Sequence, residues 1–152
     1  MSSNRELAEA YLEDAEYTLE EARRALERGY YHRAVRRAQE CVELCLKAVL
    51  RLYGIEYPKA HDVSSVLVRV RDRLPDWFAA ELDFVIEAST TLAMQRAPSF
   101  YGDEYRGVPA RRLFSGEDAL RALEYASRIL SLARKLYELW LRGPSPAGSE
   151  RV

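Results

Sequence analysis

Residue types that could bind a phosphorylated ligand occur together between Arg96 and Tyr105, where the sequence reads RAPSFYGDEY. Arginine offers a planar fork that matches phosphate oxygens, tyrosine can stack on a base, and aspartate can accept hydrogen bonds from sugar or base donors. Arg96, Tyr101 and Asp103 are therefore candidates for binding a nucleotide or RNA, and we expect the Arg96 guanidinium to lack a partner in the free protein. The competing interpretation is structural, with Phe100 and Tyr101 closing the end of a helical bundle.

A second group of candidates is basic and lies at the start of a predicted helix. It comprises three arginines beside a histidine: Arg33, Arg36 and Arg37 beside His32. Helical spacing puts these arginines on one flank of the helix, where they could hold phosphates, and Arg37 is the phosphate contact that we select. Alternatively, the flank is solvated and pairs with acids of the preceding helix, such as Glu9 and Glu13.

Lys47 and His61 complete the candidate binding residues. Lys47 follows Glu43 by four residues, which on a helix is typical of a surface ion pair and also allows a phosphate contact. His61 precedes Asp62 at a predicted helix start, where it serves either as a turn residue or as a ligand. The sequence contains no Gly-rich phosphate loop, CxxC pair or HExxH motif, so we expect neither a metal nor a cofactor.

The cysteines and the start of the chain indicate a cytoplasmic protein. Cys41 and Cys45 are four residues apart, a spacing that shares one helix face but is usually too constrained to bridge, so we expect buried free thiols. The first residues are charged and carry no apolar segment of the signal-peptide type. No stretch approaches the roughly 18 uncharged apolar residues that a membrane span needs.

The overall charge is nearly balanced, with 23 basic and 24 acidic residues. A basic binding surface must therefore be local rather than global. Of the basic residues 20 are arginine, and only three amide side chains occur. Few amides and many ion-pairing side chains suit a thermophilic source. A GC-rich genome would give the same preference for arginine over lysine, so both explanations stay open.

Two long helices are predicted at the start of the chain. The first opens with a capping box of Ser3 and Glu6, runs from about residue 4 to 28 and ends at Gly29. Its apolar residues recur every three or four positions, at Leu7, Tyr11, Ala15, Thr18, Ala22 and Leu26. The second covers residues 30–53, and its apolar residues are small: Ala34, Ala38, Cys41, Cys45, Ala48 and Leu52. Small residues allow close approach, so this helix is expected at the centre.

Three more helices follow a loop at residues 55–61. Asp62 is expected to cap a short helix that ends before Pro75, and Pro75 opens a fourth helix that runs to about Gln95. Residues 96–114 form a long irregular segment. Ser115 and Asp118 open the last helix, with apolar residues at Ala119, Leu123, Ala126, Leu130, Ala133, Tyr137 and Trp140 and an end at Gly143.

These patterns predict an all-α fold, an up-and-down bundle of four long helices plus one short helix. The bundle forms a single domain over residues 1–143, and residues 144–152 are expected to be a flexible tail. The irregular segment at residues 96–114 is rich in apolar side chains, namely Pro98, Phe100, Tyr101, Tyr105, Val108, Leu113 and Phe114. Exposed apolar patches of this kind mark interfaces, so we expect the segment at or near a twofold dimer contact.

Several short motifs occur in a characteristic order. Residues 38–50 read AQECVELCLKAVL, Gly54 follows, His-Asp-Val stands at residues 61–63 with Val-Leu at 66–67, and Arg-Ala-Pro stands at 96–98. In this order and spacing the chain resembles the HEPN family (higher eukaryotes and prokaryotes nucleotide-binding domain). The motifs are similar to the family's Ala, Glu, Leu-Lys-Ala pattern, its His-Asp-Leu element and the Arg-Tyr-Pro ending of its fourth helix.

The resemblance implies a bundle that forms a symmetric dimer. Many HEPN proteins are metal-independent RNases, often toxins, that use an arginine followed after four to six residues by a histidine. After Arg96 those positions hold Tyr101, Gly102 and Asp103, and no histidine follows His61. The resemblance therefore favours the non-catalytic branch, which binds nucleotide or RNA and is commonly encoded beside a minimal nucleotidyltransferase, as in toxin–antitoxin modules.

Two alternatives remain open. The first is a divergent metal-independent RNase, in which Arg96 stabilises charge on the phosphate and Tyr101 or Asp103 replaces the histidine. The second is a dimerisation or interaction module without a ligand.

Overall fold

The computed structural model describes residues 2–143, and the predicted flexible tail at 144–152 lies outside the described residues. The helices, in chain order, are α1 (Ser2–Glu27), α2 (Tyr31–Leu52), α3 (Ser64–Arg69), a 3-10 turn (Arg71–Arg73), α4 (Asp76–Ala79), α5 (Leu82–Tyr101), α6 (Ala110–Leu113) and α7 (Gly116–Arg142). The all-α prediction with four long helices is confirmed, while the short elements are more numerous than predicted. No helix within residues 2–143 is long and apolar enough to cross a membrane.

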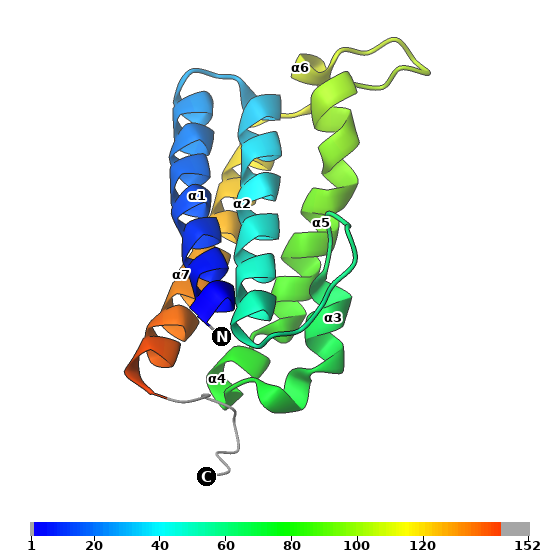
Figure 1. The fold of residues 1–152 in the computed structure, drawn as a ribbon. Coiled ribbons are helices and arrows are strands. Elements are labelled where there is room, and N and C mark those ends of the chain that lie inside the picture. The colour runs from blue at the N-terminus through cyan, green and yellow to red at the C-terminus, as the bar shows by residue number, and fades with distance from the viewer. Residues whose placement is uncertain (1, 144–152) are drawn as a thin grey trace.

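The second helix, α2, is the centre of the bundle, as predicted. It packs against α1, α7 and α5, and Figure 1 shows α1 and α7 on one side of it and α5 on the other. The predicted apolar residues of α2 are all buried, from Ala34 through Cys41 and Cys45 to Leu52. Because most of these side chains are small, three neighbouring helices approach the α2 backbone closely.

The buried face of α1 is centred one residue further along than predicted. The residues with almost no exposure are Ala8, Leu12, Ala15, Leu19 and Ala22. Leu7, which the pattern placed on the buried face, is 38% exposed. The shift arises because α1 packs against both α2 and α7, so that its buried face is wider than a single row of residues.

The predicted start of the last helix is confirmed. Ser115 Oγ accepts a hydrogen bond from the Asp118 backbone N–H at 3.1 Å, and an Asp118 carboxylate oxygen accepts from the Ser115 N–H at 2.9 Å. This reciprocal pair is a capping box, which satisfies two backbone donors at the helix start. At the other end of the chain, α1 begins at Ser2, so Ser3 lies inside the helix and the predicted cap there is wrong.

The prediction for residues 75–114 is wrong in two respects. The expected fourth helix is two helices, α4 and α5, separated at Ala80 and Glu81. In addition, α5 continues through Pro98 to Tyr101, so the irregular segment is shorter than expected. A proline inside a helix removes one backbone hydrogen bond. The last turn persists because Arg36 of α2 donates to the Ser99 carbonyl oxygen at 2.9 Å.

A glycine ends α5 where the chain reverses direction. Gly102 has φ +73°, and a Cβ atom at this position would collide with the Val108 carbonyl oxygen and the backbone of residues 109–110. Asp103 and Val108 then form an isolated antiparallel bridge, with N···O distances of 2.8 and 2.9 Å. In Figure 1 this turn projects beyond the end of the bundle before α6.

Both cysteines are fully buried in the core between the long helices. Burial, with a further contribution from neighbouring Cys41, raises the pKa of the Cys45 thiol well above its usual value. Because the thiolate is the reactive form, this pKa makes Cys45 unreactive in the folded state, and burial shields both thiols from reagents.

We therefore predict that a thiol reagent labels neither cysteine until the protein unfolds. Substituting alanine for Cys41 or Cys45 should lower the free energy of unfolding by about 1–2 kcal/mol through lost packing. Labelling kinetics of the native protein, followed by mass spectrometry beside denaturant melts, measure both effects. Rapid labelling of the native protein would contradict the placement of these thiols.

Candidate functional site

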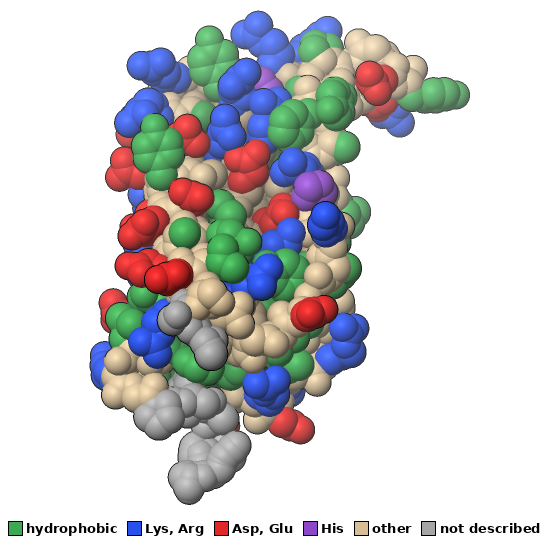
Figure 2. All heavy atoms as spheres, in the orientation of Figure 1, with side chains coloured by type: hydrophobic (Ala, Val, Ile, Leu, Met, Phe, Trp, Pro, Cys, Tyr) green, Lys and Arg blue, Asp and Glu red, His purple; other side chains and the backbone are tan. Residues whose placement is uncertain are grey.

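Arginines gather at one end of the bundle. Figure 2 shows basic side chains concentrated where α1 turns into α2, near the end of α5. They lie on or next to α1, α2, α5 and α6: Arg24, Arg28, Arg33, Arg36, Arg37, Arg96, Arg111 and Arg112. The pKa of His32 is lowered below its usual value, first by burial and then by the positive charges of Arg36, Arg33 and Arg111. This group is called the arginine-rich end below.

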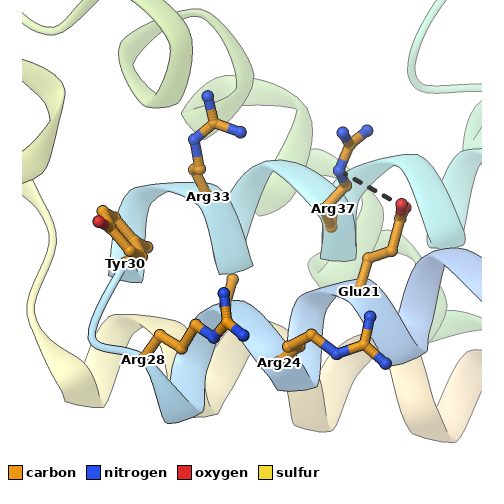
Figure 3. Close-up of a pocket in the computed structure, with 7 residues that line it drawn as sticks. Glu21, Arg24, Arg28, Tyr30, Arg33 and Arg37 are labelled. Carbon is orange, nitrogen blue, oxygen red and sulfur yellow. Dashed lines mark ion pairs between the residues drawn. The ribbon is translucent and has the colours of Figure 1, made fainter.

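A pocket of about 480 Å³ lies on the outer surface between α1 and α2 at this end. Its lining residues are Glu21, Arg24, Ala25, Arg28, Tyr30, Arg33 and Arg37. Figure 3 shows that Arg24 and Arg28 come from the end of α1, whereas Arg33 and Arg37 come from α2. Four guanidinium groups and one carboxylate make the lining strongly positive.

A short turn holds the two halves of this pocket together. The Tyr30 N–H donates to the Ala25 carbonyl oxygen at 2.9 Å, and the Gly29 N–H donates to that of Leu26 at 3.0 Å. These two bonds form a Schellman motif, which requires a left-handed residue, and Gly29 supplies it with φ +80°. The pocket is therefore built on a tight turn with satisfied backbone groups rather than on a long loop.

On the other side of α2, a polar network joins this helix to α5 and to the loop before α3. The Arg96 guanidinium donates to Gln39 Oε1 at 2.5 Å, and Gln39 Nε2 donates to Glu43 Oε1 at 3.1 Å. Glu43 also contacts His61 Nδ1 at 3.0 Å and accepts from Lys47 Nζ at 2.9 Å. Gln39 is only 2% exposed, so it links α2 to α5 from inside the protein.

The pKa of Glu43 reflects these contacts. Burial alone would raise it, but hydrogen bonds from Lys47, Gln39 and His61 outweigh burial and lower it below the usual value of 4.5. A carboxylate held in this way stays ionised and keeps its donors oriented.

An aromatic ring lies under two arginines at the end of α5. The Arg36 guanidinium carbon is 3.8 Å from the centre of the Phe100 ring, and that of Arg96 is 5.2 Å from it. Burial, followed by repulsion from Arg33 and Arg37, lowers the pKa of Arg36. Stacking on an aromatic face offsets part of this repulsion and brings both guanidinium groups over one ring.

The HEPN domain family matches residues 8–136 of the chain. This chain belongs to the HEPN family. Among solved structures it is similar to ST0689, an archaeal HEPN homologue, with 30% identity and a TM-score of 0.65 over 86% of this chain and 97% of that chain. It is also similar to TT1696 from Thermus thermophilus, with 27% identity and a TM-score of 0.70 over 84% and 96% of the two chains. No curated protein matches the chain significantly.

The resemblance read from the sequence motifs is thus confirmed, and the HEPN motif residues can be placed in the structure. Arg96, Lys47 and His61 share one network, which Gln39 and Glu43 connect. The expectation that Arg96 lacks a partner is wrong, because Gln39 on α2 faces it across the helix contact.

The remaining predicted site residues lie around this network rather than in it. Arg37 pairs with Glu40 at 2.7 Å and with Glu21 of α1 at 3.6 Å. The expected alternative, a pair with an acid of the preceding helix, is therefore present for Arg37, with Glu21 in place of Glu9 or Glu13. Tyr101 is 67% exposed, and its ring centre is 5.8 Å from that of Phe100.

Asp103 stabilises its own turn. One carboxylate oxygen accepts from the Arg106 N–H at 3.1 Å, and the other lies 3.6 Å from Arg106 Nε. Its backbone is held by the bridge to Val108. Of the predicted residues, Asp103 therefore has the clearest structural role in this HEPN chain.

Sequence reasoning missed several residues of the site. Gln39 stands out in the sequence only as part of a motif, and nothing in its spacing reveals a contact with a helix 57 positions away. The sequence does contain a signal for Arg24, Arg28 and Tyr30. Two arginine pairs at four-residue spacing lie on either side of Gly29, where the chain turns from one helix into the next. Within residues 2–143, no group of three or more His, Cys, Asp or Glu side chains is arranged to hold a metal.

We predict that Glu43→Gln destabilises the protein by about 1–3 kcal/mol at neutral pH, because Lys47 and His61 lose a charged acceptor in a half-buried site. A carboxyl group whose pKa is lowered on folding contributes stability above its unfolded value. That contribution is lost as the pH falls through the folded value. The difference between wild type and variant should therefore shrink below the usual pKa of 4.5.

Chemical denaturation at pH 7 and at successively lower pH measures this difference. Glu124→Gln, which removes an exposed carboxylate on α7, is the control and should change the unfolding free energy by less than about 0.5 kcal/mol. A Glu43→Gln difference that stays constant with pH would contradict the account.

Proposed function

We propose that this HEPN protein binds a nucleotide or RNA in the cytoplasm at its arginine-rich end and does not cleave it. The observation that carries the proposal is the segregation of charge. The chain has a formal net charge of −1, yet arginines from four helices meet at one end of the bundle. Phosphate groups are the ligands that clustered guanidinium forks recognise best.

In this proposal Arg96 is the principal phosphate contact. A guanidinium has five N–H donors, and the bond to Gln39 uses one of them. The other N–H donors of Arg96 remain to bind phosphate oxygens, while Gln39 orients the guanidinium. Tyr101 and Asp103 would line the rim beyond Arg96, with the largely exposed Tyr101 ring able to stack on a base.

Lys47, His61 and Arg37 are proposed as further contacts on either side of α2. Lys47 and His61 lie on the same carboxylate, that of Glu43, which fixes their positions relative to Arg96. Arg37 lies on the flank of α2 that faces α1. Together these residues would let one nucleotide or a short RNA segment cross the α2 surface.

The non-catalytic part of the proposal rests on the residues after Arg96. The positions where HEPN RNases carry histidine hold Tyr101, Gly102 and Asp103. Of these, Gly102 has no side chain and Asp103 is engaged with Arg106, which leaves neither as a ready general base. Incubation of the protein with mixed RNA without metal tests this directly, and cleavage would favour the RNase alternative.

We also propose that the protein forms a twofold dimer and acts with a minimal nucleotidyltransferase in a toxin–antitoxin-like module. Support for the dimer comes from exposed apolar side chains at the end of α5 and beyond it. Tyr101 is 67% exposed, Tyr105 99% and Met94, on the outer face of α5, 78%. A surface of this kind on a helical bundle is typical of an interface.

Arg96→Ala should weaken binding of a short single-stranded RNA at least tenfold. It should also lower the free energy of unfolding by about 1–3 kcal/mol, because the buried Gln39 loses a charged donor. Gln39→Ala is the matched variant, since it breaks the same hydrogen bond but keeps the guanidinium.

We expect Gln39→Ala to bind RNA better than Arg96→Ala does, although both variants are destabilised. Arg121→Gln, a charge removal on the exposed face of α7, controls for general electrostatics. Titration by fluorescence anisotropy, beside melting curves, gives the comparison. Equal RNA binding by wild type and Arg96→Ala would remove Arg96 from the site.

The dimer prediction is tested by light scattering at tens of micromolar protein. The expected mass is twice the 17.5 kDa of one chain. Tyr105→Glu introduces a charge at the most exposed aromatic side chain and should shift the mass toward one chain. A strictly monomeric wild-type protein would refute the dimer.

A further inference from the structure

We propose that the pocket between α1 and α2 is a second anion site, which binds a linear chain of three or more phosphate groups. It lies within the arginine-rich end, but of the individual contacts proposed above it includes only Arg37, and it requires neither Arg96 nor the Glu43 network. The ligand class follows from the number, spacing and pairing of the arginines that line it.

The arginines of the pocket occur as two like-charged pairs. Arg24 and Arg28 are four residues apart at the end of α1, and Arg33 and Arg37 are four apart on α2. Like charges at this spacing share a helix face and repel each other, which destabilises the free helix. A bound polyanion neutralises both members of a pair and so removes the repulsion that solvent only screens.

Three of these arginines have no acidic partner among the described residues. Arg24, Arg28 and Arg33 are exposed and form no ion pair within residues 2–143, while Arg37 is shared between Glu40 and Glu21. The lining thus carries four positive charges against one carboxylate, that of Glu21, which gives a formal charge of +3. Such a charge matches a triphosphate better than a single phosphate.

The geometry of the two helices also favours a chain of phosphates. Side chains four apart on one helix are separated by about 5–6 Å at Cβ, and packed helices lie about 8–10 Å apart. Arginine side chains on such a frame can spread along a ligand that is longer than one phosphate group. Successive phosphates of a chain can contact them in turn, each through a planar fork.

The frame that carries the arginines is fixed before any ligand binds. The Schellman motif at Gly29 joins α1 to α2 directly, and the Arg37–Glu21 pair bridges the helices on the far side of the pocket. A preorganised site loses less entropy on binding than a flexible loop does. The arginine side chains themselves remain extended toward solvent, where a highly charged ligand is accessible.

Tyr30 lies at the edge of the pocket with its side chain 49% exposed. If the polyphosphate is part of a nucleoside triphosphate, this ring can stack on the base. A free inorganic polyphosphate would not use it. The phosphate chemistry is common to both sources, and the experiment below separates them.

Isothermal titration of the full chain with inorganic triphosphate, ATP and AMP tests the site. Triphosphate and ATP should bind at least tenfold more tightly than AMP, and the affinity should fall as salt is raised. The double variant Arg24→Gln with Arg28→Gln should weaken triphosphate binding at least tenfold. Arg33→Gln, on α2, should also weaken triphosphate binding. It replaces the double variant in the test if the double variant does not fold.

The control is Arg121→Gln with Arg142→Gln, which removes two exposed charges from α7 and should leave the affinity within about twofold. In the Arg96→Ala background the loss of triphosphate binding caused by the pocket variants should persist, so failure of the RNA site and failure of this site are distinguishable. If ATP binds more tightly than inorganic triphosphate and Tyr30→Ala removes the difference, the ligand is a nucleoside triphosphate. If ATP and triphosphate bind equally, the site recognises the phosphate chain alone. Absence of triphosphate binding, or equal losses in the pocket variants and the α7 control, would overturn the proposal.

Discussion

The close packing of α2 against three other helices is the constraint on which the rest of the structure depends. Alanine and cysteine side chains along its buried face let α1, α7 and α5 approach its backbone. A larger residue at Ala38 or Cys41 would push a neighbouring helix outward. Both polar regions of the protein are built on the flanks of this one helix, so its position determines their geometry.

The network around Glu43 shows how this constraint produces a site. Gln39 is almost completely buried because α5 lies close to α2, and burial obliges its amide to find partners. It finds them in Arg96 on one side and Glu43 on the other. The packing of α5 against α2 therefore also orients the Arg96 guanidinium. Loosening this helix contact would disorder Arg96.

Regular periodicity made the long helices and their order predictable from the sequence. The α2 face was predicted fully because one side of the helix is apolar and small. The α1 face was displaced because that helix carries two adjacent apolar rows, one through Leu7 and one through Ala8, and spacing alone does not decide between them. The end of α5 could not be predicted from local rules. Pro98 favours a helix end on its own, whereas Arg36, far away in sequence, supports the last turn by donating to the Ser99 carbonyl oxygen and stacking on the Phe100 ring.

The residue types of the candidate site were predictable from the sequence, but the contacts between them were not. The Glu43–Lys47 pair followed from its spacing, since both residues lie on one helix. The contact between Arg96 and Gln39 depends on two helices that are distant in sequence. The pocket at Gly29 would have been predictable, because tight antiparallel helices bring residues on either side of a turn together. Arginine pairs at four-residue spacing on both sides of that glycine are the signal to look for in related chains.

The proposed function divides the molecule, with phosphate recognition at the arginine-rich end and none at the opposite end, which carries α3 and α4. Hydrogen–deuterium exchange of the full chain, with and without saturating short RNA, tests this division most directly. Protection should increase in residues 24–40 and 96–112, while α3 and α4 should exchange as in the free protein. Unchanged exchange at the arginine-rich end, or protection confined to α3 and α4, would contradict it.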